Sequence, residues 1–308
     1  MSAPAPGGSV PRVSAIVVSY NTRDHLLRCL EALLAPTGVS LEAILVDNAS
    51  TDGSVEAVRA RFPGVRVIAN AANLGFSRAN NLGLRAARGP CVLVVNSDCE
   101  VRPDAVGTLC AILEARPDVA IVGPRTVGTD GAPQLSFGPS LTPLAEWRQS
   151  RLVRGVKAGE AAALSRASAL AQREQEPDWV SASCFLARRE ALDAVGGFDE
   201  SFFLYEEDVD LCLRVRRAGW RVVYTPTAEV VHHLGRSMDR APAFARLEYH
   251  RSHLRFYGKH NSAADRIALR AWMAGRAAWL WLSAGAGGPG RERRAEARAI
   301  LSLALFGR

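Results

Sequence analysis

The chain lacks the sequence signatures of several large protein classes. Its six cysteines include no C-x-x-C pair and follow no metal-ligand spacing, so a zinc module is not expected and a reducing compartment fits. No uncharged apolar run reaches the roughly 18 residues of a membrane span, and residues 1–11 lack the basic and apolar regions of a signal peptide. We therefore expect a cytoplasmic protein that is neither secreted nor membrane-spanning by itself.

Lysine is nearly absent. Lys157 and Lys259 are the only two, so the net charge of +7 comes almost wholly from arginine. A basic protein suits an anionic partner such as a nucleotide diphosphate or an acidic membrane surface. No basic run interleaved with aromatic residues is present, and nucleic acid is therefore not an expected partner. The length of 308 residues allows a sizeable core.

Short apolar runs alternate with helical patterns through the first 122 residues. This alternation predicts an α/β fold with a mostly parallel central sheet flanked by helices on both faces. Ligands bind at the carboxyl ends of the strands in such sheets, where Ser19 to Asn21, Asp47 to Asp52 and Asn96 to Asp98 fall. The predicted strands are 13–19, 43–46, 65–69, 91–95 and 119–122, and the predicted helices follow Thr22 and span 54–61, 80–88 and 103–114.

The second half of the chain is less regular. Residues 140–178 are expected to form a mobile helical insertion, followed by an apolar stretch from Trp179, a helix at 188–195, a helix ending at Ala218 and a strand at 221–224. We expect a flexible tail at 1–12, a main domain at 13–240 and a helical C-terminal extension at 241–308. In that extension one helix side is expected to pack on the main domain or to attach shallowly to membrane, and both alternatives stay open. That side carries Leu269, Trp272, Met273, Trp279 and Leu280.

An acidic segment between Gly196 and Cys212 is the most informative stretch. It carries six acidic residues among Phe198, Phe202, Phe203 and Tyr205. Such aromatics imply partial burial, and buried carboxylates are costly unless they bind a metal or polar ligand or hold a proton. A plain helix start would explain Glu200 or Asp210, the latter as a helix cap, but not the whole cluster. The acids are Asp199, Glu200, Glu206, Glu207, Asp208 and Asp210.

This segment and several upstream pieces resemble the family 2 glycosyltransferases with a GT-A fold, especially the bacterial branch that includes rhamnosyltransferases. The resemblance spans residues 13 to about 240, and its pieces arrive in the family's order. They are Val17-Val-Ser-Tyr-Asn21, Val46-Asp-Asn-Ala-Ser-Thr-Asp-Gly-Ser54, Asn73-Leu-Gly-Phe76 with Asn80, Asn96-Ser-Asp98, the acidic segment, and His232 with Ser237.

A nucleotide site is expected at the first strand ends. The Asp47 carboxylate ends an apolar strand and can accept the imide N–H of uracil or thymine. The resemblance implies that Gly75 allows close backbone approach in a second nucleotide-facing segment. The nucleotide-sugar residues implied in this way are Ser19, Tyr20, Asn21, Asn48, Asn73, Gly75, Phe76, Asn80 and Ser97.

The resemblance also implies a divalent cation, Mg²⁺ or Mn²⁺, held largely by the donor's phosphates. Asp98 matches the family's metal-binding aspartate, while Asn96 replaces the first acid of the fuller motif. Glu100 is expected on the same face as Asp98 if the strand continues. His232 matches the later metal- or phosphate-binding histidine, with His233 as the competing residue.

Asp208 matches the family's catalytic base, which removes the proton of the acceptor hydroxyl. Glu207 is expected to contact acceptor or to orient the loop. Trp179 either lines the acceptor side or belongs to the core. The family's usual Gly-Ala pair ahead of this segment is replaced by Ser181-Ala182-Ser183.

The resemblance implies an inverting, metal-dependent glycosyltransferase. The donor would be a nucleotide-diphosphate sugar, with dTDP-rhamnose favoured, and the acceptor a glycan or lipid-linked cell-envelope or polysaccharide precursor. A UDP-hexose donor and a non-catalytic nucleotide-sugar-binding module are the alternatives. A dinucleotide-dependent oxidoreductase is excluded, because the turn at 19–23 has no G-x-G-x-x-G. Peripheral contact with the cytoplasmic face of the inner membrane is an open part of this expectation.

Overall fold

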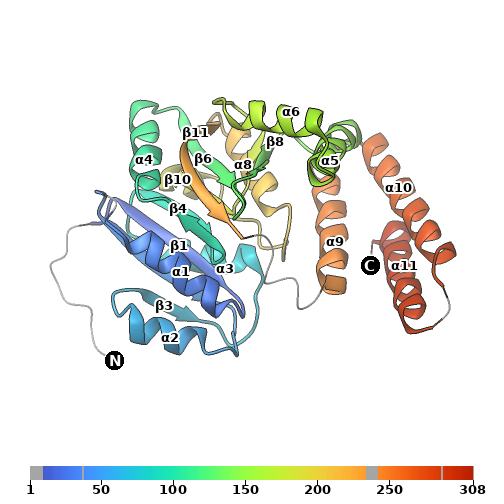
Figure 1. Cartoon of the computed structure of the whole chain (residues 1–308), viewed down its shortest axis with the longest axis horizontal. Coiled ribbons are helices and arrows are strands. Elements are labelled where there is room, and N and C mark those ends of the chain that lie inside the picture. The colour runs from blue at the N-terminus through green and yellow to red at the C-terminus, as the bar shows by residue number, and fades with distance from the viewer. Residues whose placement is uncertain (1–9, 37, 234–241, 286, 308) are drawn as a thin grey trace.

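The computed structural model describes residues 10–36, 38–233, 242–285 and 287–307. Ser237, the expected tail up to residue 9 and the expected boundary at 240–241 lie outside these ranges. Among the described residues, nine strands form one sheet in the order β3-β2-β1-β4-β10-β6-β11-β5, with β7 paired to β6 (Figure 1). These strands are β1 Val13–Ser19, β2 Leu41–Asp47, β3 Arg66–Ala69, β4 Cys91–Asn96, β5 Cys99–Val101, β6 Val119–Val127, β7 Pro133–Gln134, β10 Cys184–Arg188 and β11 Arg221–His232.

The first half of the sheet is parallel, as expected. β1 lies between β2 and β4 and pairs in parallel with both, and β2 pairs in parallel with β3. The register places Ser19 opposite Asp47 and Val18 opposite Asn96. The carboxyl ends of these strands therefore meet at one edge, which positions the loops that follow them.

The second half mixes directions. β10 runs antiparallel to both β4 and β6, whereas β11 is parallel to β6 and antiparallel to β5. The sequence did not predict β5, β7 or β10 as strands, because runs of two to five residues show no clear periodicity. The partners of β5 and β10 also lie far away in the chain. β11 also continues well past the predicted end at Tyr224.

Helices cover both faces of the sheet, which confirms the layered α/β architecture. Leu26, Val58 and Leu109 belong to the core on one face, while Ala79 and Leu211 belong to the core on the other. The helices of the first face are α1 Arg23–Leu34, α2 Ser54–Arg61 and α4 Ala105–Ala115, and those of the second are α3 Phe76–Ala86, α7 Arg189–Ala194 and α8 Glu207–Arg217.

The expected helical insertion is present as two helices, α5 Pro143–Lys157 and α6 Ala161–Ala171. The Thr142 hydroxyl caps α5 by accepting from the Ala145 N–H at 3.3 Å. Two short strands flank the insertion, β8 Phe137–Gly138 before it and β9 Trp179–Val180 after it, and they pair antiparallel with each other. The insertion therefore leaves and returns to the domain at one place.

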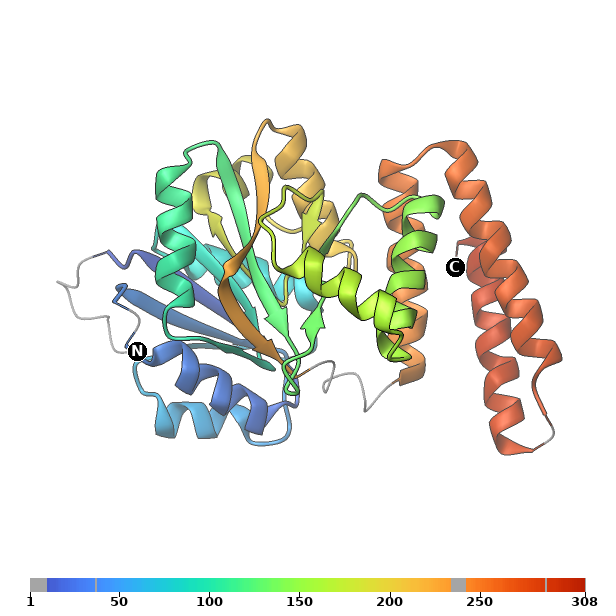
Figure 2. The same ribbon diagram turned by 45° about the horizontal axis from the view of Figure 1, so that its top comes forward.

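Three long helices complete the chain: α9 Pro242–His260, α10 Ala263–Leu282 and α11 Gly288–Phe306. α9 lies beside α5, and α10 and α11 lie side by side at the far end of the molecule (Figure 2). A third core cluster joins Phe202 and Val209 of the acidic segment and α8 to Phe256 of α9 and Met273 of α10. Of the two open alternatives, packing against the main domain is thus what α9 and the inner face of α10 do.

The prediction of which residues form the apolar side of α10 was partly wrong. Leu269, Met273 and Ala277 are buried, whereas Trp272 and Trp279 are 54% and 64% exposed. The buried residues recur every four positions, while the two tryptophans share a neighbouring stripe with Arg276, whose guanidinium lies 5.9 Å from the Trp272 ring centroid. Arg276, which interrupts the apolar pattern in the sequence, thus belongs to the exposed side of the helix. Among the described residues, no helix has the length and apolar character needed to cross a membrane.

Candidate active site

Asp47 ends β2 with a fully buried side chain. Its Oδ2 accepts from the Ser50 N–H at 2.8 Å, which closes the turn that follows the strand. Its Oδ1 is buried and has no hydrogen-bond partner among the described residues. Because an unpaired buried carboxylate oxygen is costly, this atom marks a place where a ligand donor fits.

The loops after β1 and β2 are joined by side chains. Asn21 has a left-handed backbone with φ 55°, and its Oδ1 accepts from the Thr51 N–H at 2.8 Å. The Asn21 N–H in turn donates to Ser50 Oγ at 2.8 Å. Asn21 therefore joins the two loops, and the neighbouring Tyr20 is exposed beside it.

A chain of hydroxyls crosses the same strand ends. Thr22 Oγ1 lies 3.0 Å from Ser19 Oγ and 2.8 Å from Ser97 Oγ, and all three side chains are buried. The structure thus brings together the predicted residues Ser19 and Ser97. It adds Thr22, which the sequence had suggested only as a helix cap.

In the second predicted nucleotide-facing segment, which begins at Asn73, the side-chain amides mainly make hydrogen bonds that stabilise the turn before Phe76. Asn48 Oδ1 accepts from Asn70 Nδ2 at 2.9 Å, and Asn48 Nδ2 donates to the Gly75 carbonyl at 3.2 Å. Asn73 Oδ1 accepts from the Gly75 N–H at 3.0 Å. Asn80 differs, because its Oδ1 is buried and has no partner among the described residues.

Gly75 has φ 81°, and a Cβ built on it would lie 2.5 Å from the Phe203 carbonyl oxygen. The next residue, Phe76, donates its N–H to that same oxygen at 2.7 Å. The close approach that this glycine permits in the structure is therefore to the acidic segment, whereas the sequence interpretation had directed it at the nucleotide. The turn at Gly75 and Phe76 and the acidic segment are therefore in direct contact.

A group of potential metal ligands follows β4. Ligand atoms of Asp98, Cys99 and His232 lie within 4.8 Å of one another. His232 Nε2 is 3.4 Å from Asp98 Oδ1, and its Nδ1 is 3.1 Å from Gln134 Oε1, a residue that the sequence analysis missed. Burial opposes ionisation of Asp98, but the hydrogen bond and charge of His232 lower the pKa of the carboxyl overall.

Cys99 is the weakest of these three ligands. Its side chain lies in the core, and burial raises the pKa of its thiol well above the usual value. A protonated, buried thiol is a poor ligand. Asp98 and His232 remain, a carboxylate and an imidazole that fit a divalent cation completed by ligand oxygens.

The competing histidine points elsewhere. His233 Nε2 lies 2.8 Å from Glu100 Oε1, and Arg28 Nε lies 3.5 Å from the same oxygen. Glu100, expected on the face of Asp98, is thus engaged in a separate charge cluster. The geometry favours His232 as the partner of Asp98.

Asp208 is the second residue of α8 and is partly buried. Its Oδ2 accepts from the Ala182 N–H at 3.0 Å, and its Oδ1 accepts from the Val209 N–H at 2.9 Å. Burial raises the pKa of Asp208, although these backbone donors work against that shift. A carboxylate with a raised pKa is a suitable base near neutral pH.

Glu207 is buried beside Asp208. Burial, reinforced by the charge of Asp208, raises its pKa well above the usual value. Its Oε2 has no hydrogen-bond partner among the described residues. Glu207 therefore offers an unpaired buried oxygen next to Asp208.

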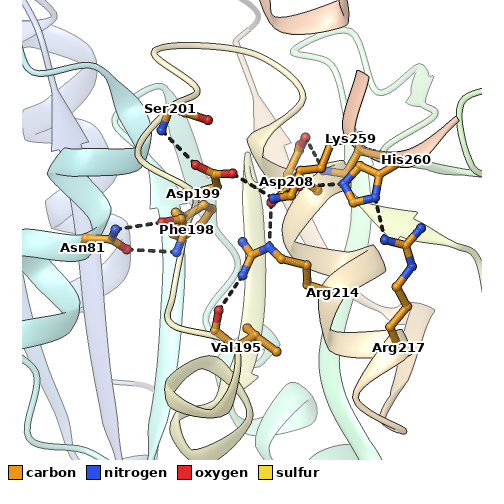
Figure 3. Close-up of polar contacts among 12 residues, drawn as sticks. Asn81, Val195, Phe198, Asp199, Ser201, Asp208, Arg214, Arg217, Lys259 and His260 are labelled. Atoms are coloured by element: carbon orange, nitrogen blue, oxygen red, sulfur yellow. Dashed lines mark hydrogen bonds and ion pairs between the residues drawn. The ribbon is translucent and has the colours of Figure 1, made fainter. Parts of the chain in front are cut away.

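Asp210 is not the helix cap that the sequence suggested. It is fully buried in the first turn of α8, with Arg214 Nε 2.7 Å from Oδ2. Lys259 Nζ and His260 Nε2 lie 2.6 Å and 2.7 Å from Oδ1. Burial raises the pKa of Asp210, but these partners lower it overall. Figure 3 shows the side chains of Arg214, Lys259 and His260 pointing toward one another.

Trp179 packs against both the second and the third core clusters, and its indole N–H donates to the Pro139 carbonyl at 2.8 Å. The core alternative for this residue is thus realised, and any contact with an acceptor stays a prediction.

These groups share one edge of the sheet. β4 pairs with β10, and beyond that pair the Asn96 N–H donates to the Ser183 carbonyl at 2.9 Å. The loop that carries Asp98 is therefore tied to the loop whose Ala182 holds Asp208. Through the pairing of β1 with β2 and β4, Asp47 lies at the same edge.

A mixed sheet with helices on both faces and carboxylates along one edge is the arrangement of a glycosyltransferase of the GT-A class. Residues 14–196 match the family model described as Glycosyl transferase family 2. The chain belongs to glycosyltransferase family 2, as its motifs predicted.

Among sequence relatives, the chain is 35% identical over 274 residues to the N-acetylglucosaminyl-diphospho-decaprenol L-rhamnosyltransferase of Mycobacterium tuberculosis, covering 83% of this chain and 87% of the relative. It is 31% identical to the O-antigen biosynthesis protein RfbC of Myxococcus xanthus, covering 79% of this chain and 19% of that protein. The chain is thus rhamnosyltransferase-like.

Solved structures confirm the GT-A fold. The mannosyltransferase PcManGT from Pyrobaculum calidifontis, in complex with GDP-Man and Mn²⁺, superposes with a TM-score of 0.59 at 19% identity, covering 97% of this chain and 88% of that one. GalNAc-T7 with UDP, GalNAc and Mn²⁺ gives a TM-score of 0.54 at 16% identity, covering 80% and 48%.

Proposed function

We propose that this glycosyltransferase is inverting and metal-dependent. It transfers a sugar from a nucleotide-diphosphate donor, with dTDP-rhamnose favoured, to a hydroxyl of a cell-envelope or polysaccharide precursor. The observation that carries the proposal is the adjacent pair Glu207 and Asp208, both with raised pKa, at the sheet edge that also holds Asp47. The similarity to the mycobacterial rhamnosyltransferase supports the donor, and a UDP-hexose is the second candidate.

In this proposal Asp47 recognises the base of the donor. Its unpaired Oδ1 accepts the imide N–H that uracil and thymine both present. Ser50 holds the other oxygen, so the carboxylate is oriented before the donor arrives. The buried Asn80 Oδ1 of α3, which has no partner among the described residues, offers a second acceptor.

Asp98 and His232 would hold the cation, Mg²⁺ or Mn²⁺, together with the donor's phosphates. Bound there, the cation would neutralise charge on the leaving diphosphate. Gln134 orients the His232 ring through Nδ1, which leaves Nε2 facing Asp98.

Asp208 is the base of the proposed reaction. As the acceptor oxygen attacks the anomeric carbon, Asp208 takes its proton, and the nucleotide diphosphate leaves from the opposite face. A single displacement of this kind inverts the anomeric configuration. Glu207, whose pKa burial raises well above the usual value, contacts the acceptor or orients the loop in this proposal.

The C-terminal helices suit peripheral contact with the cytoplasmic face of an anionic membrane. Trp279, Leu282 and Phe306 are 64%, 83% and 69% exposed. Arg298 lies 5.0 Å from the Trp281 ring centroid. Exposed aromatics beside arginines are typical of interfacial helices, and a lipid-linked acceptor such as that named for the mycobacterial relative would be met there.

Asp47→Asn should weaken binding of UDP and dTDP by about 10- to 150-fold, since one charge-assisted hydrogen bond contributes roughly 1.5–3 kcal/mol. The asparagine can still accept from Ser50 but presents an N–H₂ to the base. Isothermal titration calorimetry measures the affinity, and thermal unfolding checks the fold. Equal affinities for wild type and variant would remove Asp47 from the site.

Removal of divalent metal should abolish turnover, because Asp98 and His232 alone cannot balance the diphosphate charge. His232→Ala should weaken Mn²⁺ binding in the presence of dTDP by at least about tenfold. His233→Ala is the matched control and should change it little. Full turnover after exhaustive chelation would refute the metal assignment.

Asp208→Asn should lower kcat by about 10²–10⁴-fold with donor affinity unchanged, because the amide keeps the shape but cannot take a proton. Turnover is measured as dTDP released from dTDP-rhamnose with N-acetylglucosaminyl-diphospho-decaprenol as acceptor. In the wild type, kcat/KM should rise with pH through the raised pKa of Asp208. Glu207→Gln should cost less and act more on acceptor KM; if neither variant lowers turnover, this segment is not catalytic.

Trp279→Ser combined with Leu282→Ser should reduce co-sedimentation with vesicles containing phosphatidylglycerol by about tenfold, since both side chains would leave the interface. Trp147→Ser is the matched control, because Trp147 of α5 is 53% exposed and also lies beside an arginine, Arg151. An equal loss in the control, or no binding by the wild type, would contradict membrane contact.

A further inference from the structure

The turn that delivers Asp208 has an unfavourable backbone. Tyr205 and Glu206, directly before α8, have φ of 71° and 64°. Two successive non-glycine residues in the left-handed region persist only where the surroundings hold them. Glu206 is also the first residue before the helix, and its side chain makes no capping hydrogen bond. Contacts with other elements of the fold therefore stabilise this turn.

One of these elements is α9, which contacts the acidic segment along its length. Ser252 Oγ donates to the Leu204 carbonyl at 2.7 Å, directly before the left-handed pair. The ring of Tyr249 meets the ring of Tyr205 edge to face at 5.8 Å between centroids. At the C-terminal end of α9, Lys259 Nζ lies 2.8 Å from Asp199 Oδ2 (Figure 3).

His253 is the centre of these contacts. Its side chain is 2% exposed, and its Nδ1 lies 3.0 Å from Glu206 Oε1. Its Nε2 lies 3.0 Å from Glu146 Oε2 of α5, and the Tyr257 hydroxyl donates to the other Glu146 oxygen at 2.6 Å. The imidazole thus joins three elements that are remote in sequence: the turn before α8, the insertion and α9.

The pKa of His253 is consistent with its contacts to the two carboxylates. Burial alone would lower the pKa of His253, but its hydrogen bonds and charge interactions with Glu146 and Glu206 raise it to about 9. The neighbouring His250 offers a contrast on the same helix. It is also buried, but it faces Trp272 of α10, and burial lowers its pKa to about 4.

We propose that His253 is a positioning residue for the acceptor site, because it holds the Glu206 carboxylate and with it the left-handed turn that brings Glu207 and Asp208 to the start of α8. In this proposal α9, through His253, helps to position the proposed base Asp208. This inference rests on the proposed role of Asp208 as the base.

His253→Leu should lower kcat by about 10- to 100-fold with dTDP affinity within twofold of wild type, since a small misplacement of a catalytic group costs this much. His250→Leu is the matched control on the same helix and should stay within about threefold. Thermal unfolding shows that both variants fold. A His253→Leu kcat equal to that of His250→Leu would overturn the proposal.

A double-mutant cycle with Glu206→Gln tests the route of the effect. If His253 acts through Glu206, the two losses in kcat are strongly non-additive, and the double variant resembles the worse single one. Purely additive losses would show that His253 acts otherwise and would overturn the proposal. His253→Gln, which keeps one donor toward Glu206, should recover part of the kcat lost in His253→Leu.

Hydrogen–deuterium exchange gives a readout that does not depend on turnover. In His253→Leu the peptide spanning residues 199–210 should exchange at least about tenfold faster, whereas in His250→Leu it should match wild type. Unchanged exchange in His253→Leu would overturn the positioning role even if no sugar transfer were detected. Fast exchange together with an active Asp208→Asn variant would instead place the failure in the assignment of the base.

Discussion

The cost of burying carboxylates shapes this active site. Asp98 and Asp210 are buried with cationic or imidazole partners, which lower the pKa of each carboxyl. Asp47 and Glu207 are buried with one oxygen that has no partner among the described residues. The protein itself pairs the carboxylates of the first pair, and each member of the second pair leaves one oxygen open to a ligand. The desolvation penalty of the first pair is offset by protein partners, and in the second pair one oxygen is left for the ligand contact that we propose.

The acidic segment connects the parts of the molecule. Phe203 meets the nucleotide-side turn through Gly75 and Phe76, Asp208 meets the loop after β9 through Ala182, and Glu206 meets α9 through His253. The residues that we propose on the donor side and on the acceptor side are therefore joined through this segment. The C-terminal helices belong to this arrangement because the cluster around Phe202 and Met273 anchors them to it.

Much of the fold could be predicted from local pattern. The strand Val13–Ser19 and the helix Ser54–Arg61 have the predicted bounds, because continuous apolar runs and helical spacing between turn residues are strong local signals. β10 was not predicted, although it lies in the middle of the sheet, because its five residues are fixed by pairing with two distant strands. The exposed stripe of α10 was misread because hydrophobicity alone does not say which of two neighbouring stripes finds a partner.

The sequence by itself determined the family, the order of the first parallel strands and the residue types at their carboxyl ends, because these depend on motifs and on the short-range order of strands and loops. Only the tertiary structure decided which groups are paired. It assigned His232 to Asp98 and His233 to Glu100, turned Asp210 from a helix cap into a buried ion-pair centre, and placed His253 against Glu206. The physical reason is that burial and charge partners arise from packing between segments up to 134 residues apart, His232 and Asp98 among them, which no local pattern encodes.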